Sequence, residues 1–149
     1  MKLGDIVYFK YLIFKDGVKD KKENRPCIYL FEECIKDVNY VYTIPITSAL
    51  YRFNKDEENK LVLIPETIFN YKKISFAKVV GIIKSLKKDM IFSNISLSGD
   101  TMKYLLRKTI EIATDIDLKG KLEELEEELY KANDYSEPVM VRRLTKKRK

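Results

Sequence analysis

The side chains that could act together on a phosphate group stand at the ends of predicted strands. They are Arg25, Thr47, Ser48, Tyr51 and Arg52. An arginine guanidinium is a planar, permanently charged fork that matches phosphate oxygens, and a hydroxyl adds a neutral hydrogen-bond donor. If the strand ends converge, Arg25 with Thr47 and Ser48 would bind a phosphodiester and stabilise the negative charge that develops on it.

The amino-acid composition excludes many other kinds of site. The chain has no histidine and only two cysteines, Cys27 and Cys34, which rules out an ordinary His/Cys zinc site and every mechanism that uses a catalytic histidine. Its five glycines form no phosphate-binding loop. We therefore expect no metal and no cofactor, and we expect both cysteines to be small buried hydrophobic residues.

The positive charge is concentrated in one segment. Of the 29 basic residues, six lie in residues 142–149, which leaves 23 to balance the 23 acidic residues in the rest of the chain. A segment of this kind can neutralise phosphates, although a solvated basic tail is the alternative interpretation.

The length of 149 residues is suited to a single domain. The longest apolar runs are about five residues, whereas a membrane-spanning helix needs about 20. The sequence also opens on charged residues instead of a secretory signal. We therefore expect a cytoplasmic protein that does not associate with membranes.

Short runs rich in β-branched and aromatic residues occupy roughly the first two thirds of the chain, with charged or turn-forming stretches between them. Neighbouring runs can form hairpins, and five or six short strands at this spacing predict a small barrel in a mainly antiparallel α+β fold. The expected strands are residues 6–14, 26–32, 40–46, 60–64, 78–84 and 91–97.

After Ser98 the apolar residues recur three and four positions apart, which predicts an amphipathic helix. We expect Gly120 to end this helix and a second helix to start at Lys121. Leucines at 118, 122, 125 and 129 would dock on the domain or on a symmetry mate. The expected units are a barrel domain with its helix (1–116), an additional amphipathic helix (117–134) and a basic C-terminal tail (135–149).

Three short motifs follow one another along the chain. They are Gly-Asp-Ile-Val at 4–7, Arg-Pro-Cys-Ile-Tyr-Leu at 25–30 and Ile-Pro-Ile-Thr-Ser at 44–48. Their residue types and separations resemble the MazF/PemK (Kid) family of toxin endoribonucleases, and residues 76–83 and 98–102 follow in the same order. The resemblance covers roughly residues 3–116.

This resemblance implies an SH3-like small barrel of the MazF/PemK/CcdB type and a homodimer. It also implies metal-independent, sequence-specific cleavage of single-stranded RNA by attack of the ribose 2′-hydroxyl, which leaves a 2′,3′-cyclic phosphate. Arg25 and Thr47 match the family's catalytic residues, and Ser48 lies beside Thr47. The RNA-binding residues that we expect are Lys21, Lys22, Tyr51, Arg52, Lys78, Arg142 and Arg143.

The Thr-Ser pair is also similar to the ToxN-like toxins, whose antitoxin is a structured RNA. That branch has a lysine in its active site, for which Lys21, Lys22 and Lys78 are the candidates here. The antitoxin is therefore either a protein (type II) or an RNA (type III). Residues 20–24 and 78–81 depart from the MazF/PemK pattern, so substrate contacts at those positions do not follow from the family.

Two other functions are compatible with the sequence. One is a noncatalytic nucleic-acid-binding SH3-like module in which Tyr8, Tyr40, Tyr42 and Tyr51 stack on bases. The other is a protein-interaction adaptor that uses the leucine stripe at 118–129.

Overall fold

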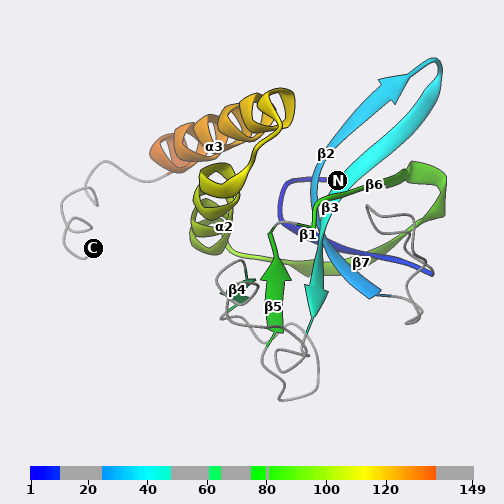
Figure 1. Cartoon of the computed structure of the whole chain (residues 1–149). Coiled ribbons are helices and arrows are strands. Elements are labelled where there is room, and N and C mark those ends of the chain that lie inside the picture. Colours follow the sequence, from blue (N-terminus) through cyan, green and yellow to red (C-terminus); the bar gives the residue numbers. More distant parts are fainter. Residues whose placement is uncertain (11–24, 48–60, 65–74, 80, 137–149) are drawn as a thin grey trace.

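A computed structural model describes residues 1–10, 25–47, 61–64, 75–79 and 81–136 (Figure 1). Seven strands and two α-helices occupy these ranges, with one short 3₁₀ turn. The elements are β1 (Asp5–Phe9), β2 (Arg25–Ile35), β3 (Val38–Thr47), β4 (Leu61–Ile64), β5 (Ser75–Lys78), β6 (Ile83–Leu86), η2 (Lys87–Asp89), β7 (Met90–Ser96), α2 (Gly99–Ile112) and α3 (Ile116–Ser136).

The strands form one antiparallel sheet in the order β4-β5-β3-β2-β1-β7, and β6 pairs with β3. The α+β, mainly antiparallel fold class is therefore confirmed. A closed barrel is not confirmed, because no pairing within the described ranges joins β4 to β7.

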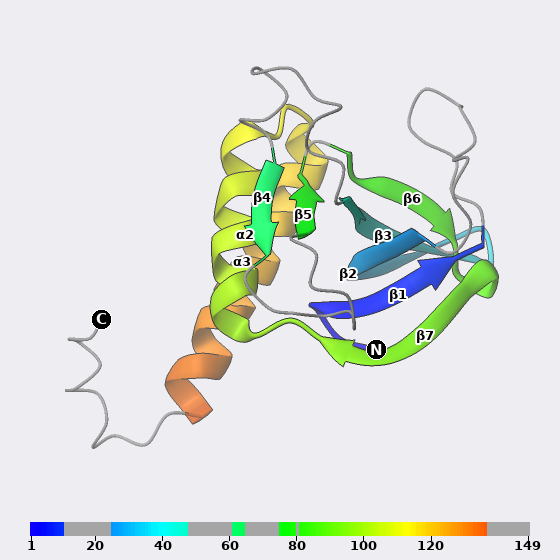
Figure 2. The same cartoon turned by 90° about the horizontal axis from the view of Figure 1, so that it is seen from below.

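The two faces of the sheet carry different apolar clusters, because successive strand residues point to opposite sides. On the helix face, Ile28, Ile44 and Ala77 pack with Leu105 and Leu106 of α2. Figures 1 and 2 show both helices on this side of the sheet. The second face carries a smaller buried cluster of Val7, Phe9, Cys27, Tyr29, Val41, Ile83 and Met90.

Both helices begin at capped positions. The Ser98 hydroxyl accepts a hydrogen bond from the Thr101 amide at 3.2 Å, and the Asp115 carboxylate accepts one from the Leu118 amide at 3.0 Å. The first of these helices, α2, ends at Ile112, and Gly120 lies inside the second, α3. The expectation that Gly120 separates the two helices is wrong, because the cap at Asp115 starts α3 before Gly120.

The leucine stripe of α3 docks on the domain, as one of the two alternatives predicted. Leu122 is fully buried, and Leu118, Leu125 and Leu129 are partly buried against the cluster of the helix face. The Arg107 guanidinium on α2 also pairs with both carboxylate oxygens of Glu126 on α3. The two helices are thus joined by an apolar seam and a bidentate ion pair.

Two further local predictions are wrong. Residues 78–84 do not form one strand: Ala77 lies opposite Ile46 and Ile83 lies opposite Thr43, so six steps along the chain span three along β3. Between these two pairings, the Gly81 amide donates a 2.9 Å hydrogen bond to the Lys78 carbonyl. In addition, Cys27 is buried but Cys34 is exposed near the tip of the β2–β3 hairpin.

Thr43 is a fully buried polar residue on β3, opposite Tyr29. Among the residues that the structure describes, its Oγ1 atom has no hydrogen-bond partner. Because desolvating a hydroxyl without a partner is costly, we expect Thr43→Val to raise the free energy of unfolding by about 1–2 kcal/mol, measured by urea denaturation. Thr43→Ala, which also removes a methyl group, is the control, and its free energy of unfolding should rise less than that of Thr43→Val. A loss of stability in Thr43→Val would show that the hydroxyl is satisfied.

Among the described residues, no helix has the length and apolar character needed to cross a bilayer.

Candidate active site at the ends of β2 and β3

Arg25 and Thr47 lie next to each other where β2 begins and β3 ends. The β2–β3 register pairs Cys27 with Pro45, two residues from Arg25 and Thr47 respectively. The Arg25 Nη1 atom donates a 3.1 Å hydrogen bond to the Ile46 carbonyl. Both side chains are half-buried. The guanidinium is thus held at the end of β3, beside the predicted catalytic threonine.

Lys78 on β5 belongs to the same face of the sheet. Ile46 is opposite Ala77 in the helix-face cluster, so Lys78 and Phe76 point to the second face, as Arg25 and Thr47 do. The stem of Lys78 lies against Gly81, where an added Cβ would be 3.4 Å from its Cγ and Cδ atoms. Three of the predicted site residues therefore share one face on three neighbouring strands.

Phe76 is a member of this face that the sequence did not indicate. It is opposite Thr47 on β5 and is half-buried. A phenylalanine in a short strand is usually a packing residue. The residue opposite Thr47 is known only once the pairing of β3 with β5 is known, so the sequence held no usable signal for it.

The other predicted site residues lie outside the described ranges. They are Ser48, Lys21, Lys22, Tyr51, Arg52, Arg142 and Arg143. In the described ranges, no three acidic or cysteine side chains gather closely enough to hold a metal ion. The described part of the site therefore consists of one guanidinium, one hydroxyl and one ammonium group, a set that suits binding of a phosphate and stabilisation of charge on it.

The chain matches no family model. No curated protein matches it either. The functional interpretation of Arg25, Thr47 and Lys78 accordingly depends on their placement and on the sequence motifs.

The tyrosines of the β2–β3 hairpin make contacts within the protein. The Tyr42 ring stacks on Phe31, with centroids 4.4 Å apart and planes 14° apart, and the Lys84 ammonium lies 4.5 Å from the centre of the Tyr40 ring. Burial, together with a 2.7 Å hydrogen bond from the Tyr42 hydroxyl to Glu33, raises the pKa of Tyr42 to about 12. These contacts favour a packing role for Tyr42 over base stacking.

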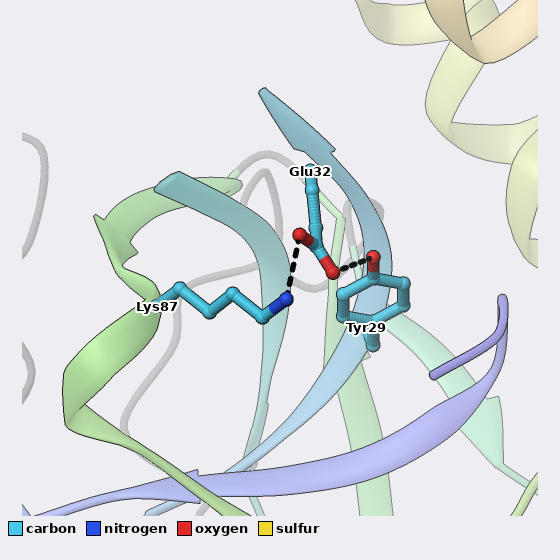
Figure 3. A network of polar contacts seen from close by, with 3 residues as sticks. All are labelled: Tyr29, Glu32 and Lys87. Carbon is cyan, nitrogen blue, oxygen red and sulfur yellow. Dashed lines mark hydrogen bonds and ion pairs between the residues drawn. The ribbon is translucent and has the colours of Figure 1, made fainter. Parts of the chain in front are cut away.

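A polar network joins β2 to η2 (Figure 3). The Glu32 carboxylate accepts a 3.0 Å hydrogen bond from the Lys87 ammonium and a 3.1 Å bond from the Tyr29 hydroxyl. The bond from Lys87 is the main reason that the pKa of Glu32 lies below its usual value. Burial first, and then Glu32, raise the pKa of Tyr29 above its usual value. The network connects the hairpin to η2.

The network makes a pH-dependent contribution to stability. A carboxylate whose pKa is lowered by folding stabilises the folded state above its ordinary pKa, and this contribution is lost as the pH falls through the lowered value. We expect Lys87→Met to raise the pKa of Glu32, followed by its carboxyl NMR shift, and to destabilise the protein at neutral pH but not in acid. The pair is partly exposed, so we expect a loss of at most about 1 kcal/mol.

Lys88→Met is the matched control, because it removes the same charge from the adjacent position of η2. An equal shift of the Glu32 titration in both variants would mean that the general field, and not the hydrogen bond from Lys87, lowers this pKa.

Proposed function

We propose that the protein is a MazF/PemK-like or ToxN-like toxin: a metal-independent endoribonuclease that cleaves single-stranded RNA. The observation that supports the proposal is the hydrogen bond from the Arg25 guanidinium to the carbonyl of Ile46, the residue before Thr47. Arg25 and Thr47 match the catalytic residues of the family that the motifs resemble, and 21 residues lie between them in the chain. A permanently charged fork beside a hydroxyl is suited to a phosphodiester.

In this proposal the ribose 2′-oxygen attacks the adjacent phosphorus and the bond from phosphorus to the 5′-oxygen breaks. The products are a 2′,3′-cyclic phosphate and a 5′-hydroxyl, so the proton lost by the 2′-hydroxyl is balanced by the one gained by the leaving oxygen. Arg25 stabilises the extra negative charge of the pentavalent transition state and relays a proton, and Thr47 donates to a phosphate oxygen.

Lys78 is proposed as an RNA-binding residue, on the strength of its position on the same face as Arg25 and Thr47. A lysine there adds a mobile positive charge for a neighbouring phosphate. The remaining proposed RNA contacts are those predicted outside the described ranges.

The proposed partners are an antitoxin, either protein or RNA, and a second copy of the chain. β7, the last strand of the described sheet, carries exposed apolar residues that support a contact with another protein. The exposed fractions of Ile91 and Phe92 are 48% and 63%. Apolar exposure on an edge strand is a feature of interaction surfaces.

A comparison of RNA and DNA tests the chemistry. Because the 2′-hydroxyl is the proposed nucleophile, we expect the protein to cut single-stranded RNA in EDTA and to leave DNA of the same sequence intact. Thr47→Ser, which keeps the hydroxyl, should retain more activity than Thr47→Val, which has a similar shape without it. Cleavage of the DNA, or complete dependence on a divalent ion, would contradict the mechanism. Tight binding to RNA without any cleavage would favour the noncatalytic module.

A further inference from the structure

A second site lies on the helix face, away from Arg25 and Thr47. It is a groove of about 1080 Å³ between the β2–β3 hairpin, β6 and the first turns of α3. The stacked rings of Phe31 and Tyr42 form part of its apolar lining. Ile116, at the start of α3, has 83% of its surface exposed.

The charged residues of this groove are mainly acidic. Five carboxylates and two lysines line it: Glu32, Glu33, Asp115, Asp117, Glu124, Lys84 and Lys121. Lys121 is paired with Glu124 at 3.8 Å, and Lys84 lies over the Tyr40 ring. Glu32 is paired with Lys87, outside the lining. The other four carboxylates exceed the two lysines by two negative charges, which disfavours a nucleic acid and favours a cationic peptide.

The acidic surface continues along α3. Glu123, Glu127 and Glu128 are exposed on this helix beyond the groove. A cationic segment that follows α3 back towards its first turn would meet carboxylates over most of its path.

The chain itself contains a segment of matching chemistry. Residues 142–149 hold six basic side chains and no acidic one, with Leu144 among them, and they lie outside the described ranges. Residues 116 to 136 span about 30 Å of helix, whereas the 13 residues from 137 to 149 can extend over about 43–47 Å. The segment is long enough for its last residues to reach the groove of the same molecule.

We propose that the acidic groove binds the basic segment 142–149 of its own chain. The basic side chains pair with Asp115, Asp117 and Glu124, and an aliphatic side chain contacts the Phe31–Tyr42 stack. This inference does not depend on the ribonuclease proposal. If both hold, RNA and the groove compete for the same basic residues.

The test uses full-length ¹⁵N-labelled protein at low salt. A variant with glutamine at all six basic positions of 142–149 should shift the amide signals of the groove residues Lys84, Ile116 and Lys121 relative to wild type. A synthetic peptide of residues 138–149, added to this variant, should move these signals back towards their wild-type positions. High salt should abolish the effect, because it screens exposed charges.

A groove variant tests which acids are involved. Asp115→Asn, Asp117→Asn and Glu124→Gln together remove three charges, and asparagine at 115 still caps α3. We expect this triple variant to bind the peptide about tenfold more weakly, given the usual contribution of exposed ion pairs. The control removes three charges elsewhere, with Asp37→Asn, Asp89→Asn and Asp100→Asn, and should bind the peptide nearly as well as the parent.

Three outcomes would overturn the inference. Identical groove signals in wild type and the six-glutamine variant would mean that the segment does not reach the groove. Equal weakening by the two triple variants would mean that net charge alone attracts the peptide. If dilution of the wild-type protein moves its groove signals to the positions seen in the six-glutamine variant, the segment in the groove comes from a second copy.

Discussion

Arg25→Ala is expected to lower the rate of RNA cleavage by about 10²–10³-fold, which is the usual cost of removing one group that stabilises charge in the transition state. The fold should survive, because the arginine is only half-buried and its hydrogen bond to the Ile46 carbonyl is equivalent to about 0.5–1.5 kcal/mol. The measurement is the initial rate of cleavage of a single-stranded RNA in EDTA, together with urea unfolding of both proteins.

Two further variants serve as controls for the rate measured with Arg25→Ala. Arg25→Lys keeps the positive charge but loses the planar fork, so we expect a rate between those of wild type and Arg25→Ala. Lys88→Ala removes one positive charge from η2 and should leave the rate nearly unchanged. If Arg25→Ala cleaves as fast as wild type, Arg25 is not catalytic.

Gly4→Ala is expected to lower the free energy of unfolding by about 2–4 kcal/mol, the second large effect that we predict. Gly4 has a φ of +94°, which disfavours any residue with a Cβ, and an added Cβ would lie 2.9 Å from the Met102 Cγ atom. The backbone cannot move away easily, because Gly4 is hydrogen bonded to the Tyr29 carbonyl and the Leu97 amide. The measurement is urea denaturation.

Gly120→Ala is the matched substitution, and we expect it to change the free energy of unfolding in the opposite direction. Gly120 lies inside α3, and apart from its own stretch of helix no described residue has an atom within 4 Å of an added Cβ. Alanine should therefore stabilise the protein by about 0.5–1 kcal/mol through its higher helix propensity. Equal stability of Gly4→Ala and wild type would contradict the account of Gly4.

The Gly-Asp start of the chain thus has a structural role. The Asp5 carboxylate accepts a 2.6 Å hydrogen bond from the Ser96 hydroxyl and a 2.9 Å bond from the Lys2 amide. Gly4 and Asp5 fix the beginning of β1 against β2 and the end of β7. This motif therefore supports the fold, whereas the proposed activity rests on Arg25 and Thr47.

The sequence predicted the local elements better than their pairing. Residues 26–32 and 40–46 are rich in apolar residues and have a polar, turn-forming stretch around 36–39 between them, so β2 and β3 were predicted within a few positions. Residues 79–83 form a continuous apolar run between Lys78 and Lys84, and nothing in this run indicates that β5 and β6 pair with β3 at two different registers. The helix boundary predicted at Gly120 was wrong, because the cap at Asp115 is a stronger local signal for a helix start than a single glycine is for a helix end.

The two sites differ in how far the sequence can indicate them. Arg25 and Thr47 are strand-terminal residues in an ordered pair of motifs, so their proximity could be expected before the register was known. The acidic groove combines residues of β2, β3, β6 and α3. Its carboxylates are spread through a chain that is rich in charge, so only the docking of α3 on the sheet reveals that they face one cavity.

The most direct test of the proposed activity is to incubate the purified protein with a long mixed-sequence RNA in EDTA, beside Arg25→Ala, and to map every new end and its chemistry. The proposal predicts cuts by wild type alone, at a recurrent short sequence, that leave a 2′,3′-cyclic phosphate and a 5′-hydroxyl. The same cuts in both proteins, or ends that carry a 5′-phosphate, would contradict it.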